Sequence, residues 1–583
     1  MIVVHVTHEA VEKIGGIGAV IAGLMTADAY RETVSRTILV GPLFRTDQPV
    51  NKRLGEGGKV IYSSLDAITP SPWKEKFRPI EKSYDVGIIY GTRKVHDPCT
   101  GREVESEVLL FDLFHANQKR LNLFKAELFK KFAVPSAEFE DAWEYEEYVR
   151  LAEPGFEALK ALEAEGDPDE QVVLLGHEYM GMPLVLKAIL DGARHMKSVF
   201  YAHEVASVRP IVEKCEGHDT SFYNILETCS ENGRTVEDIF PQVFGNYKHA
   251  LVKAARHCDH VFAVGDFVVE ELKFLDKHFK NVDIDLVYNG IPADKITLKD
   301  KTTSRERMQD YAETLIGRRP DWICTHVCRP VLSKGLWRDL HVLHKMDPLL
   351  SKRGETAAYF LLGTMAGQRR PRDVRQMERV YGWPVGHEKG YPDLCQGEED
   401  LGDMVDAFNA EHEAVRAVLV NQWDWNPEVC GRRMPEDMTF ADIRRGTDVE
   451  FGLSIYEPYG ISQFEPLAYG AVCIVSNVCG CVGFARRAAD GKAYDNVIEG
   501  DFLDLPHPMG VEELKNLTIA QRDRIEATEC ERIAGQLMDV LPRNEETMKR
   551  LLADGYKIAG QMSWEHVMND YFMPALDRTI QPK

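Results

Sequence analysis

Short apolar runs alternate with helical patterns along the first half of the chain. The runs are bounded by polar or glycine-containing turns, which is typical of strands buried on both faces. We predict strands at 2–7, 172–178, 199–203, 261–265 and 284–288, and helices at 17–29, 183–191 and 267–278. Such strands, alternating with amphipathic helices, predict a parallel sheet covered on both faces, as in a doubly wound α/β domain.

A second series of the same kind follows a polar, charged segment at 295–309. Its predicted strands are 322–328, 359–363, 417–421, 449–456 and 471–476. We therefore expect an α/β protein with two doubly wound, Rossmann-like domains. The predicted divisions are a first domain at 1–297, a second domain at 298–560 with a helical insertion at about 369–438, and a tail at 561–583 that packs back toward the first domain.

Composition agrees with an enzyme-sized protein and narrows its partners. A chain of 583 residues, 44% of them hydrophobic, exceeds what one core usually organises. The formal charge of −23, from 93 acidic and 70 basic residues, disfavours nucleic acid and anionic membranes as partners. The start lacks a basic leader, and no apolar run reaches the ~18 residues of a membrane span. We expect a soluble, cytoplasmic protein.

The cysteines favour neither disulfides nor a metal site. Twelve cysteines are few for this length and show no framework of paired spacings. Cys324 with Cys328, and Cys479 with Cys481, approach ligand spacing, but neither pair has a matching second pair of Cys or His. Reduced thiols in the core are the preferred interpretation, and we expect no metal and no cofactor.

The segment from Ser454 to Glu465 carries two carboxylates, Glu457 and Glu465, separated by seven residues. It joins the strand at 449–456 to a helical pattern at 461–469, so backbone N–H groups and the positive helix end are expected near Gly460, Ile461 and Ser462. Glu457 would stand at the carboxyl end of a strand, where open α/β sheets bind ligands. Two carboxylates also fit a glycosidase, although the helix end suits a phosphorylated donor better.

Two further loops follow strands and carry basic residues or glycines. Lys13, Gly15 and Gly16 lie between the first strand and the first helix, where backbone can approach a ligand. They depart from the G-x-G-x-x-G pattern, so the loop is equally compatible with a tight turn. Arg329 and Lys334 follow the first strand of the second series. A guanidinium fork and a point charge on one loop are suited to clamping a diphosphate.

Two His-Glu pairs end strands in the first domain. His177 and Glu178, followed by Tyr179, end one strand, and His203 with Glu204 ends another. A zincin motif is excluded because neither pair has a second His four residues on. A lone His at a strand end is usually structural, so these residues become candidates only with the motifs above.

Taken together, these segments resemble the glycogen and starch synthases, retaining glycosyltransferases of the GT-B fold. The family's Lys-x-Gly-Gly loop matches Lys13 to Gly16, its Arg-x4-Lys clamp matches Arg329 and Lys334, and its E-x7-E motif matches Glu457 and Glu465. The segments around His177, 199–203, 221–226 and 257–262 resemble the animal and fungal branch. Gly460 to Gln463 and Ala468 to Gly470 resemble the bacterial and plant branch.

The resemblance implies transfer of glucose from UDP-glucose or ADP-glucose to the non-reducing end of an α-1,4-glucan such as glycogen, with retention and without a metal. It also implies two domains that face a deep cleft and a homo-oligomer, a tetramer in the animal and fungal branch. The implied roles are catalysis by Glu457, His203, Arg329 and Lys334; donor binding by Lys13, Gly15, Gly16, Arg329, Lys334, Tyr459, Gly460, Ile461, Ser462 and Glu465; and acceptor contact by His177, Glu178 and Tyr179.

Three other functions remain open from the sequence. A retaining enzyme of the same fold with a small sugar acceptor, of the sucrose- or trehalose-synthase type, would carry the same donor motifs. A catalytically silent glucan-binding scaffold is possible because a fold does not guarantee an activity. A nicotinamide dehydrogenase is disfavoured by the missing G-x-G-x-x-G and by two phosphate-binding loops in different domains.

Overall fold

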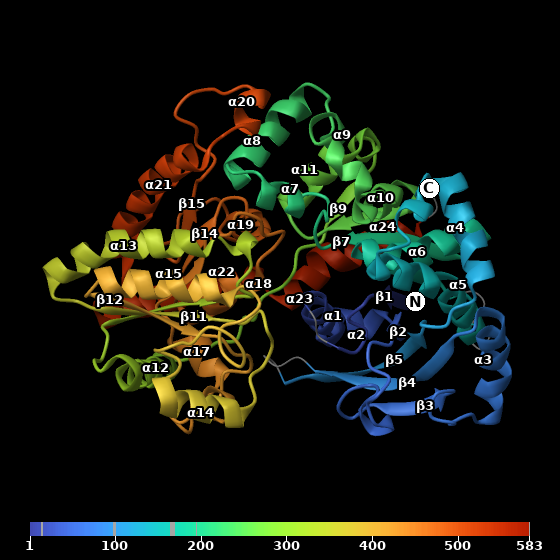
Figure 1. The fold of residues 1–583 in the computed structure, drawn as a ribbon, viewed down its shortest axis with the longest axis horizontal. Helices are drawn as coiled ribbons and strands as arrows, with labels where there is room; N and C mark the ends of the chain where they lie inside the picture. The colour runs from blue at the N-terminus through green and yellow to red at the C-terminus, as the bar shows by residue number, and fades with distance from the viewer. Residues whose placement is uncertain (13–14, 97–100, 164–169, 194, 582–583) are drawn as a thin grey trace. The chain divides into compact units, whose positions relative to one another are not determined.

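The computed structural model describes residues 1–12, 15–96, 101–163, 170–193 and 195–581. The chain divides into two compact units (Figure 1). Unit 1 comprises Met1–Pro210, Thr228–Gly290 and Trp564–Lys583, and unit 2 comprises Ile211–Glu227 and Ile291–Ser563. Apart from the inner segment Ile211–Glu227, the units change after Gly290 and after Ser563, whereas the predicted divisions are 297 and 560. In addition, Ile211–Glu227 belongs to the second unit, which the sequence pattern does not indicate.

Unit 1 is built on a nine-stranded sheet in the order β3-β4-β5-β2-β1-β6-β7-β8-β9. The strands are β1 (Ile2–Val6), β2 (Arg36–Pro42), β3 (Lys59–Ser63), β4 (Gly87–His96), β5 (Glu103–Asp112), β6 (Val172–His177), β7 (Met196–Ala202), β8 (His260–Ala263) and β9 (Ile284–Leu286). The pairs β3–β4 and β4–β5 are antiparallel, and the remaining pairs are parallel. The sheet is therefore mixed, and the prediction of a wholly parallel sheet was wrong at this edge.

Helices cover the sheet of unit 1. They are α1 (Ile17–Thr26), α2 (Asp28–Thr33), α3 (Ser71–Tyr84), α4 (Gln118–Phe132), α5 (Trp143–Glu163), α6 (Glu178–Asp191), α9 (Val236–Ile239), α10 (Tyr247–Ala254), α11 (Asp266–Leu275), α23 (Trp564–Val567) and α24 (Met573–Ile580). The helices α7 (Arg209–Lys214) and α8 (His218–Glu231) are not counted with these, because most of their residues lie in the segment Ile211–Glu227 of unit 2. Trp564 packs where Gly23 and Gly290 have no side chain, since a Cβ on either glycine would lie within 2.1–2.5 Å of the indole. This packing ties the C-terminal segment to unit 1.

Unit 2 is built on a six-stranded sheet in the order β12-β11-β10-β13-β14-β15, with parallel pairings throughout the described residues. The strands are β10 (Trp322–Val327), β11 (Ala357–Leu362), β12 (Val415–Val420), β13 (Val449–Gly452), β14 (Val472–Ser476) and β15 (Val497–Gly500). The helices are α12 (Leu298–Ile316), α13 (Leu336–Arg353), α14 (Pro371–Tyr381), α15 (Glu398–Glu411), α16 (Pro427–Cys430), α17 (Phe440–Gly446), α18 (Ile461–Phe464), α19 (Gly480–Ala488), α20 (Val511–Lys515), α21 (Ile519–Val540) and α22 (Glu545–Gln561).

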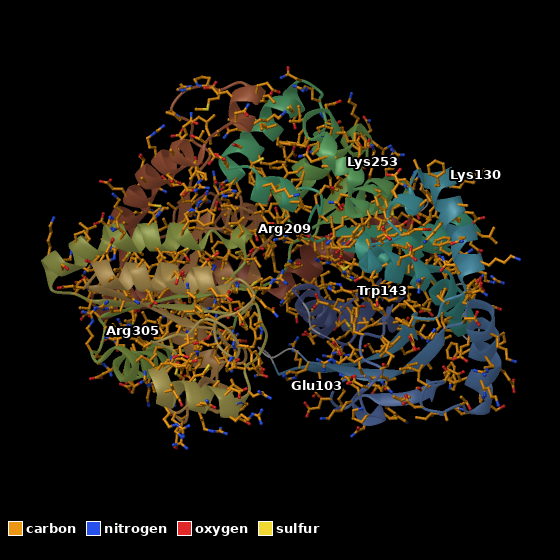
Figure 2. All side chains as sticks on the ribbon, viewed as in Figure 1. Glu103, Lys130, Trp143, Arg209, Lys253 and Arg305 are labelled. Atoms are coloured by element: carbon orange, nitrogen blue, oxygen red, sulfur yellow. The ribbon has the colours of Figure 1, made fainter. Side chains whose placement is uncertain are left out.

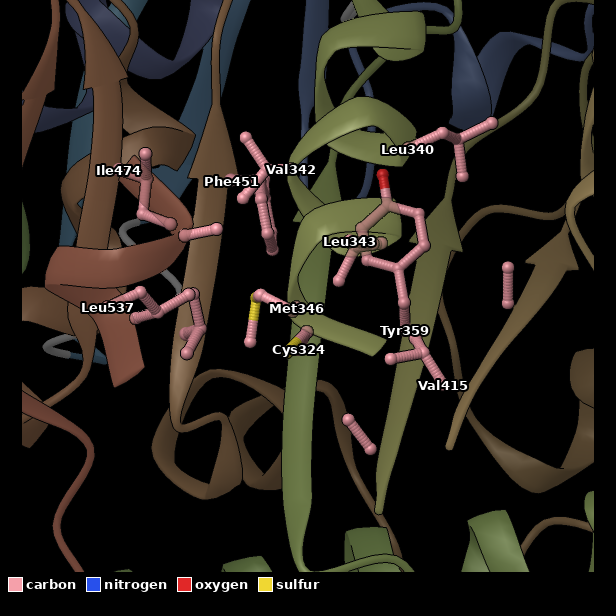
Figure 3. Packing of buried hydrophobic residues seen from close by; sticks show 14 of the residues in the cluster. Cys324, Leu340, Val342, Leu343, Met346, Tyr359, Val415, Phe451, Ile474 and Leu537 are labelled. Atoms are coloured by element: carbon pink, nitrogen blue, oxygen red, sulfur yellow. The ribbon is translucent and has the colours of Figure 1, made fainter. Parts of the chain in front are cut away.

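Both faces of this second sheet are buried, because successive residues of a strand point to opposite sides. In β11, Tyr359 and Leu361 join the core that contains α13 and α21, whereas Phe360 and Leu362 join the core that contains α12 and α14. Figure 3 shows the first of these cores, where Met346 of α13 lies beside strand residues. The continuous apolar runs of the sequence thus correspond to strands covered on both faces.

Two predicted segments of unit 2 take a different form. Most of the polar stretch at 295–309 belongs to α12, which Thr297 and Asp300 start with reciprocal capping hydrogen bonds. Within 369–438, α15 and β12 are part of the sheet's core rather than an appended hairpin, because α15 contributes Leu401 and Val405 to it. α14 also packs on the sheet, because it contributes Val374 and Met377 to the second core.

Candidate functional site

Two loops meet at the carboxyl ends of the neighbouring strands β10 and β13. The Ser333 carbonyl accepts hydrogen bonds from the N–H groups of Ile455 and Tyr456, at 2.9 and 3.2 Å. Gly335 has a φ of +61°, and a Cβ there would lie 2.5 Å from the Leu453 carbonyl oxygen. The two backbones therefore touch, and only glycine permits that approach. The parallel pairing of β10 with β13 brings these loops to the same sheet edge.

These loops carry the predicted clamp and the first carboxylate of the predicted motif. Lys334 forms an ion pair with Glu457, and their side chains are 18% and 13% exposed. Arg329 lies exposed on the same loop as Lys334. The structure thus places a cation, a carboxylate and a guanidinium at one edge of unit 2. An ion pair shielded from water is stronger than one on the surface, so it orients both groups.

Glu465 is held by an arginine that sequence reasoning missed. Arg444, on α17, pairs with Glu465 at 3.2 Å and with the buried Glu450 of β13 at 3.0 Å. Its guanidinium also donates to the Ser462 carbonyl at 2.5 Å. Arg444 is 4% exposed, so this fork fixes both Glu465 and the turn before it. No local pattern marks Arg444, because its partners depend on how α17 packs.

The predicted helix from 461 to 469 forms in two pieces. Residues Ile461–Phe464 make the single α-helical turn α18, and Glu465–Tyr469 continue as a 3₁₀ segment. Pro466 explains the break, since it has no N–H to donate within an α-helix. Glu465 accordingly begins the 3₁₀ segment instead of lying inside an α-helix.

The turn before α18 is tightly built around glycine. Gly460 has a φ of +93°, and a Cβ there would lie 2.5 Å from Gln463 Oε1 and 3.0 Å from Glu457 Cγ. The Glu457 carbonyl accepts from the Gly480 N–H at 3.0 Å. Tyr459 is 3% exposed in the whole chain. Its role at a nucleotide base stays a prediction.

The predicted histidines of unit 1 lie next to each other. His177 ends β6 and His203 follows β7, and their rings stack at a centroid distance of 5.0 Å. His177 Nδ1 and His203 Nε2 are 2.7 Å apart and share a hydrogen bond. Burial lowers the pKa of His203 to about 3 and holds the pKa of His177 well below its usual value, with neighbouring histidines adding to both effects. Both rings are therefore neutral at physiological pH.

Glu178 occupies an unusual position at the start of α6. Its φ of +57° lies in the left-handed region, which costs a non-glycine residue about 1–3 kcal/mol and is common at functional sites. Its side chain is buried, and Oε1 accepts from the Glu204 N–H at 2.5 Å. Burial first, and the charge of Glu204 second, raise the pKa of Glu178 well above its usual range. Glu204 itself pairs with Arg209, labelled in Figure 2.

Tyr179 and the N-terminal glycine loop complete the predicted set in unit 1. The Tyr179 hydroxyl donates to Glu144 Oε1 at 2.5 Å, and Lys248 Nζ lies 4.6 Å from the centre of its ring. Gly15 and Gly16 are exposed at the start of α1, where Glu9 accepts from the Gly18 N–H at 2.9 Å. Glu9 and Gly18 border a cavity of about 430 Å³. Lys13 lies outside the described residues.

The described residues hold no group of three or more His, Cys, Asp or Glu side chains arranged for a metal ion. Burial raises the pKa of the Cys479 and Cys481 thiols, so these cysteines behave as core residues. Among the described helices, none is both long and apolar enough to cross a membrane.

Comparisons with known proteins identify the fold. No family model and no curated protein matches the chain. Solved structures match over its whole length: the E. coli trehalose-6-phosphate structure bound with UDP-2-fluoro glucose at 11% identity, covering 100% of both chains with a TM-score of 0.51, and an OtsA apo structure at 11% identity, covering 100% of this chain and 99% of that one, also at 0.51. An alpha,alpha-trehalose-phosphate synthase (UDP-forming) from Burkholderia xenovorans, in complex with glucose-6-phosphate, matches at 10% identity over 99% of both chains with a TM-score of 0.50. The GT-B fold expected from the sequence is confirmed.

Proposed function

We propose that this chain is a retaining glycosyltransferase that moves glucose from a nucleotide diphosphate glucose to a sugar acceptor. The observation that carries the proposal is the pairing of Lys334 with Glu457 on two abutting loops at the carboxyl edge of unit 2. Open α/β sheets bind ligands at this edge. A cation beside a carboxylate offers one group for a diphosphate and one for the sugar attached to it.

The chemistry requires stabilisation of a leaving group. When the bond between sugar and diphosphate breaks, negative charge develops on the phosphate oxygens, and Lys334 and Arg329 are suitable partners for it. Glu457 serves the transferred glucose near its reacting carbon, and Glu465 accepts hydrogen bonds from the ribose hydroxyls. The Arg444 fork supports this role because it fixes the orientation of Glu465.

The remaining candidates take the roles that the resemblance implies. His203 supports the positive charge that develops at the anomeric carbon, and His177, Glu178 and Tyr179 serve the acceptor. Lys13, with Gly15 and Gly16, assists donor binding. The neutral histidines of unit 1 suit the hydroxyl groups of a sugar ring, whether or not the acceptor carries a phosphate elsewhere, since an unprotonated imidazole has no charge to offer a phosphate.

For the acceptor, we propose a small sugar or sugar phosphate with UDP-glucose as donor. Support comes from the matched structures, one of which is bound with UDP-2-fluoro glucose, while another is described as a UDP-forming alpha,alpha-trehalose-phosphate synthase in complex with glucose-6-phosphate. Elongation of an α-1,4-glucan is the second candidate. It is supported by the sequence segments that resemble the animal and fungal glycogen synthases, around His177 and at 199–203 and 221–226.

The test is nucleotide release measured with UDP-glucose and ADP-glucose in parallel. Each donor is offered glucose, glucose 6-phosphate, glycogen or no acceptor, and the product's anomeric configuration is read by NMR. We expect acceptor-dependent release with UDP-glucose and a small sugar. If glycogen is the acceptor that stimulates release and the small sugars do not, the result would favour elongation of an α-1,4-glucan.

Lys334→Met and Lys352→Met serve as matched variants for this assay. Both lysines belong to the same unit, and Lys352 is exposed on α13. We expect Lys334→Met to reduce release by about 10²-fold or more and Lys352→Met to leave it unchanged. Absence of acceptor-dependent release from every donor and acceptor pair would overturn the enzymatic assignment and favour a scaffold.

A further inference from the structure

A row of five hydrogen-bonding side chains crosses the interior of unit 1. It begins at His203 and passes through His177, His5 and Tyr30 to Thr37. The successive contacts measure 2.7 Å, 2.8 Å, 3.1 Å and 2.9 Å. Parallel pairing explains the alignment, because β2, β1, β6 and β7 are consecutive strands of the sheet. Thr37 pairs with Val3, His5 with Leu175 and His177 with Tyr201, so each step of the row moves two residues along the next strand and stays on the same face. Tyr30 joins the row from α2.

The two ends of the row lie in different surroundings. His203 is the end near the predicted site, at the carboxyl edge of the sheet. Tyr30 and Thr37 at the other end border a separate cavity of about 640 Å³, whose polar wall includes Glu103, labelled in Figure 2. The three histidines are neutral: burial lowers the pKa of His5 and of His203 to about 3, and that of His177 also falls well below its usual value.

Neutral imidazole has one N–H donor and one acceptor nitrogen. Both contacts between rings join Nδ1 of one ring to Nε2 of the next. If two neighbouring rings carried different tautomers, two hydrogens or two lone pairs would face each other in the contact between them. All three rings must therefore carry the same tautomer, either Nδ1–H or Nε2–H.

We propose that His203, His177 and His5 form a single tautomeric unit whose state is set by Tyr30 and Thr37. In the Nδ1–H order, Thr37 donates to Tyr30, Tyr30 donates to His5 Nε2, and His203 presents an N–H at Nδ1. In the Nε2–H order, each hydrogen bond reverses, Tyr30 donates to Thr37, and His203 presents an acceptor. His5, His177, Tyr30 and Thr37 are thus positioning residues for His203.

The change from one order to the other moves protons without creating charge. Each group gives one hydrogen to its neighbour and receives one from the other side. A water at the cavity supplies a proton to Thr37, and one leaves His203 Nδ1 to water or to a bound hydroxyl, so the row remains neutral. Burial favours such a concerted shift, because a single charged ring inside the row would be costly.

Thr37→Val tests the coupling directly. Among the described residues, the Tyr30 hydroxyl has two partners, His5 and Thr37. When the methyl of valine replaces the Thr37 hydroxyl, the Tyr30 hydrogen has one acceptor left among the described side chains, His5 Nε2. The variant should therefore hold all three rings in the Nδ1–H order. Thr92→Val is the matched control, because Thr92 borders the same cavity and lies outside the row.

The measurement is ¹⁵N NMR of histidine-labelled protein, in which the ring nitrogen shifts distinguish the two neutral tautomers. We expect the three rings to agree in the native protein and in Thr92→Val, and all three to be Nδ1–H in Thr37→Val. Rings that disagree in any of these proteins, or an Nε2–H ring in Thr37→Val, would overturn the proposal. Tyr30→Phe should abolish any effect of adding Thr37→Val, which a double-mutant comparison reads.

The effect on turnover rests on the proposed function, whereas the NMR result does not. If His203 acts beside the transferred sugar, a native protein that uses the Nε2–H order should lose severalfold in kcat on Thr37→Val, with little change in KM for the donor. If the three rings share one tautomer but the protein transfers no sugar, the single tautomeric unit stands and the proposed function is wrong. If the protein transfers sugar normally but the rings carry different tautomers, the proposed function stands and the tautomeric unit is wrong.

Discussion

The carboxyl edges of the two sheets differ in charge: the edge of unit 2 carries ion pairs, and the edge of unit 1 carries mainly neutral groups. In unit 2, Glu457 and Glu465 are each paired with a cation, Lys334 and Arg444. In unit 1, Glu178 is buried without an ion-pair partner among the described residues, beside a row of neutral histidines. Paired charges suit a charged donor whose leaving group gains negative charge. Neutral donors and acceptors of hydrogen bonds suit the hydroxyl groups of a sugar.

Replacing glutamate with glutamine at several positions tests this difference between the two edges. Glutamine keeps the shape of glutamate but has no charge. It should therefore be severe where the carboxylate acts as an anion and mild where the carboxyl group is already neutral. The predictions that follow apply it in order of decreasing effect.

Glu457→Gln should give the largest loss. Without the charge, the pair with Lys334 is lost and the transferred sugar loses its carboxylate. We expect kcat for acceptor-dependent nucleotide release to fall by about 10²–10³-fold. The dissociation constant for the donor nucleotide, measured by calorimetry, should stay within about threefold.

The matched control is Glu499→Gln in the same unit. Glu499 also pairs with an arginine, Arg486, but on the surface of the unit, where ion pairs contribute little. Its turnover should match that of the native protein. A Glu457→Gln enzyme with near-normal kcat would remove Glu457 from the proposed site.

Glu465→Gln should affect donor binding more than turnover. The Arg444 fork would lose one charged partner, and the ribose hydroxyls would lose a charge-assisted acceptor worth about 1.5–3 kcal/mol. We expect KM for the donor to rise about tenfold or more and kcat to change by less than about threefold. Kinetics over a range of donor concentrations separate the two quantities. A fall in kcat at unchanged KM would assign Glu465 to the chemistry and not to the ribose.

The sequence predicts the edge residues better than it predicts what holds them. Lys334 and Glu457 follow apolar runs, and such runs in a parallel sheet end at one edge, so their proximity could be anticipated. Pro466 was a visible signal for the broken helix. Arg444 and the row from His203 to Thr37 could not be anticipated, because their partners lie on other elements and meet only through the strand order of the sheet.

The edge of the sheet in unit 1 was missed for a related reason. The strands β4 and β5 each hold a short buried apolar run, at 88–90 and 108–111, but continue into charged residues such as Arg93 and Lys94, where the continuous apolar character ends. Pairing with a neighbouring strand, and not burial, makes these residues extended. Local pattern therefore predicts the buried centre of a sheet better than its exposed edge.

Glu147→Gln should change stability modestly. Burial, with the charge of Glu144 second, raises the pKa of Glu147 to about 7. The folded protein thus binds this proton more tightly than the unfolded chain, so stability from this group is present below the unfolded pKa and is lost as pH rises to about 7. Glutamine removes this loss. At pH 8 the free energy of unfolding should rise by on the order of 1 kcal/mol, after allowance for partial exposure.

Urea unfolding at pH 4.5 and pH 8 measures this effect. The two proteins should differ less at the lower pH, where Glu147 is largely protonated in the folded protein and about half protonated in the unfolded chain. Glu127→Gln, on the exposed face of α4, is the control and should be unchanged at both values. A Glu147→Gln protein that is less stable than the native one at pH 8 would contradict the assignment of a neutral carboxyl group.

Glu178→Gln should have the smallest effect and is the sharpest test of the comparison. Its amide oxygen can accept from the Glu204 N–H as Oε1 does at 2.5 Å, and its NH₂ can stand where a protonated carboxyl carries its hydrogen. We therefore expect kcat and KM within about threefold of the native values. Glu178→Asp should lose about tenfold or more in turnover, because the shorter side chain cannot reach the Glu204 N–H from the same backbone. If instead the kcat of Glu178→Gln falls as far as that of Glu457→Gln, Glu178 works as an anion. The two edges would then both use a charged carboxylate, and the proposed difference between them would be wrong.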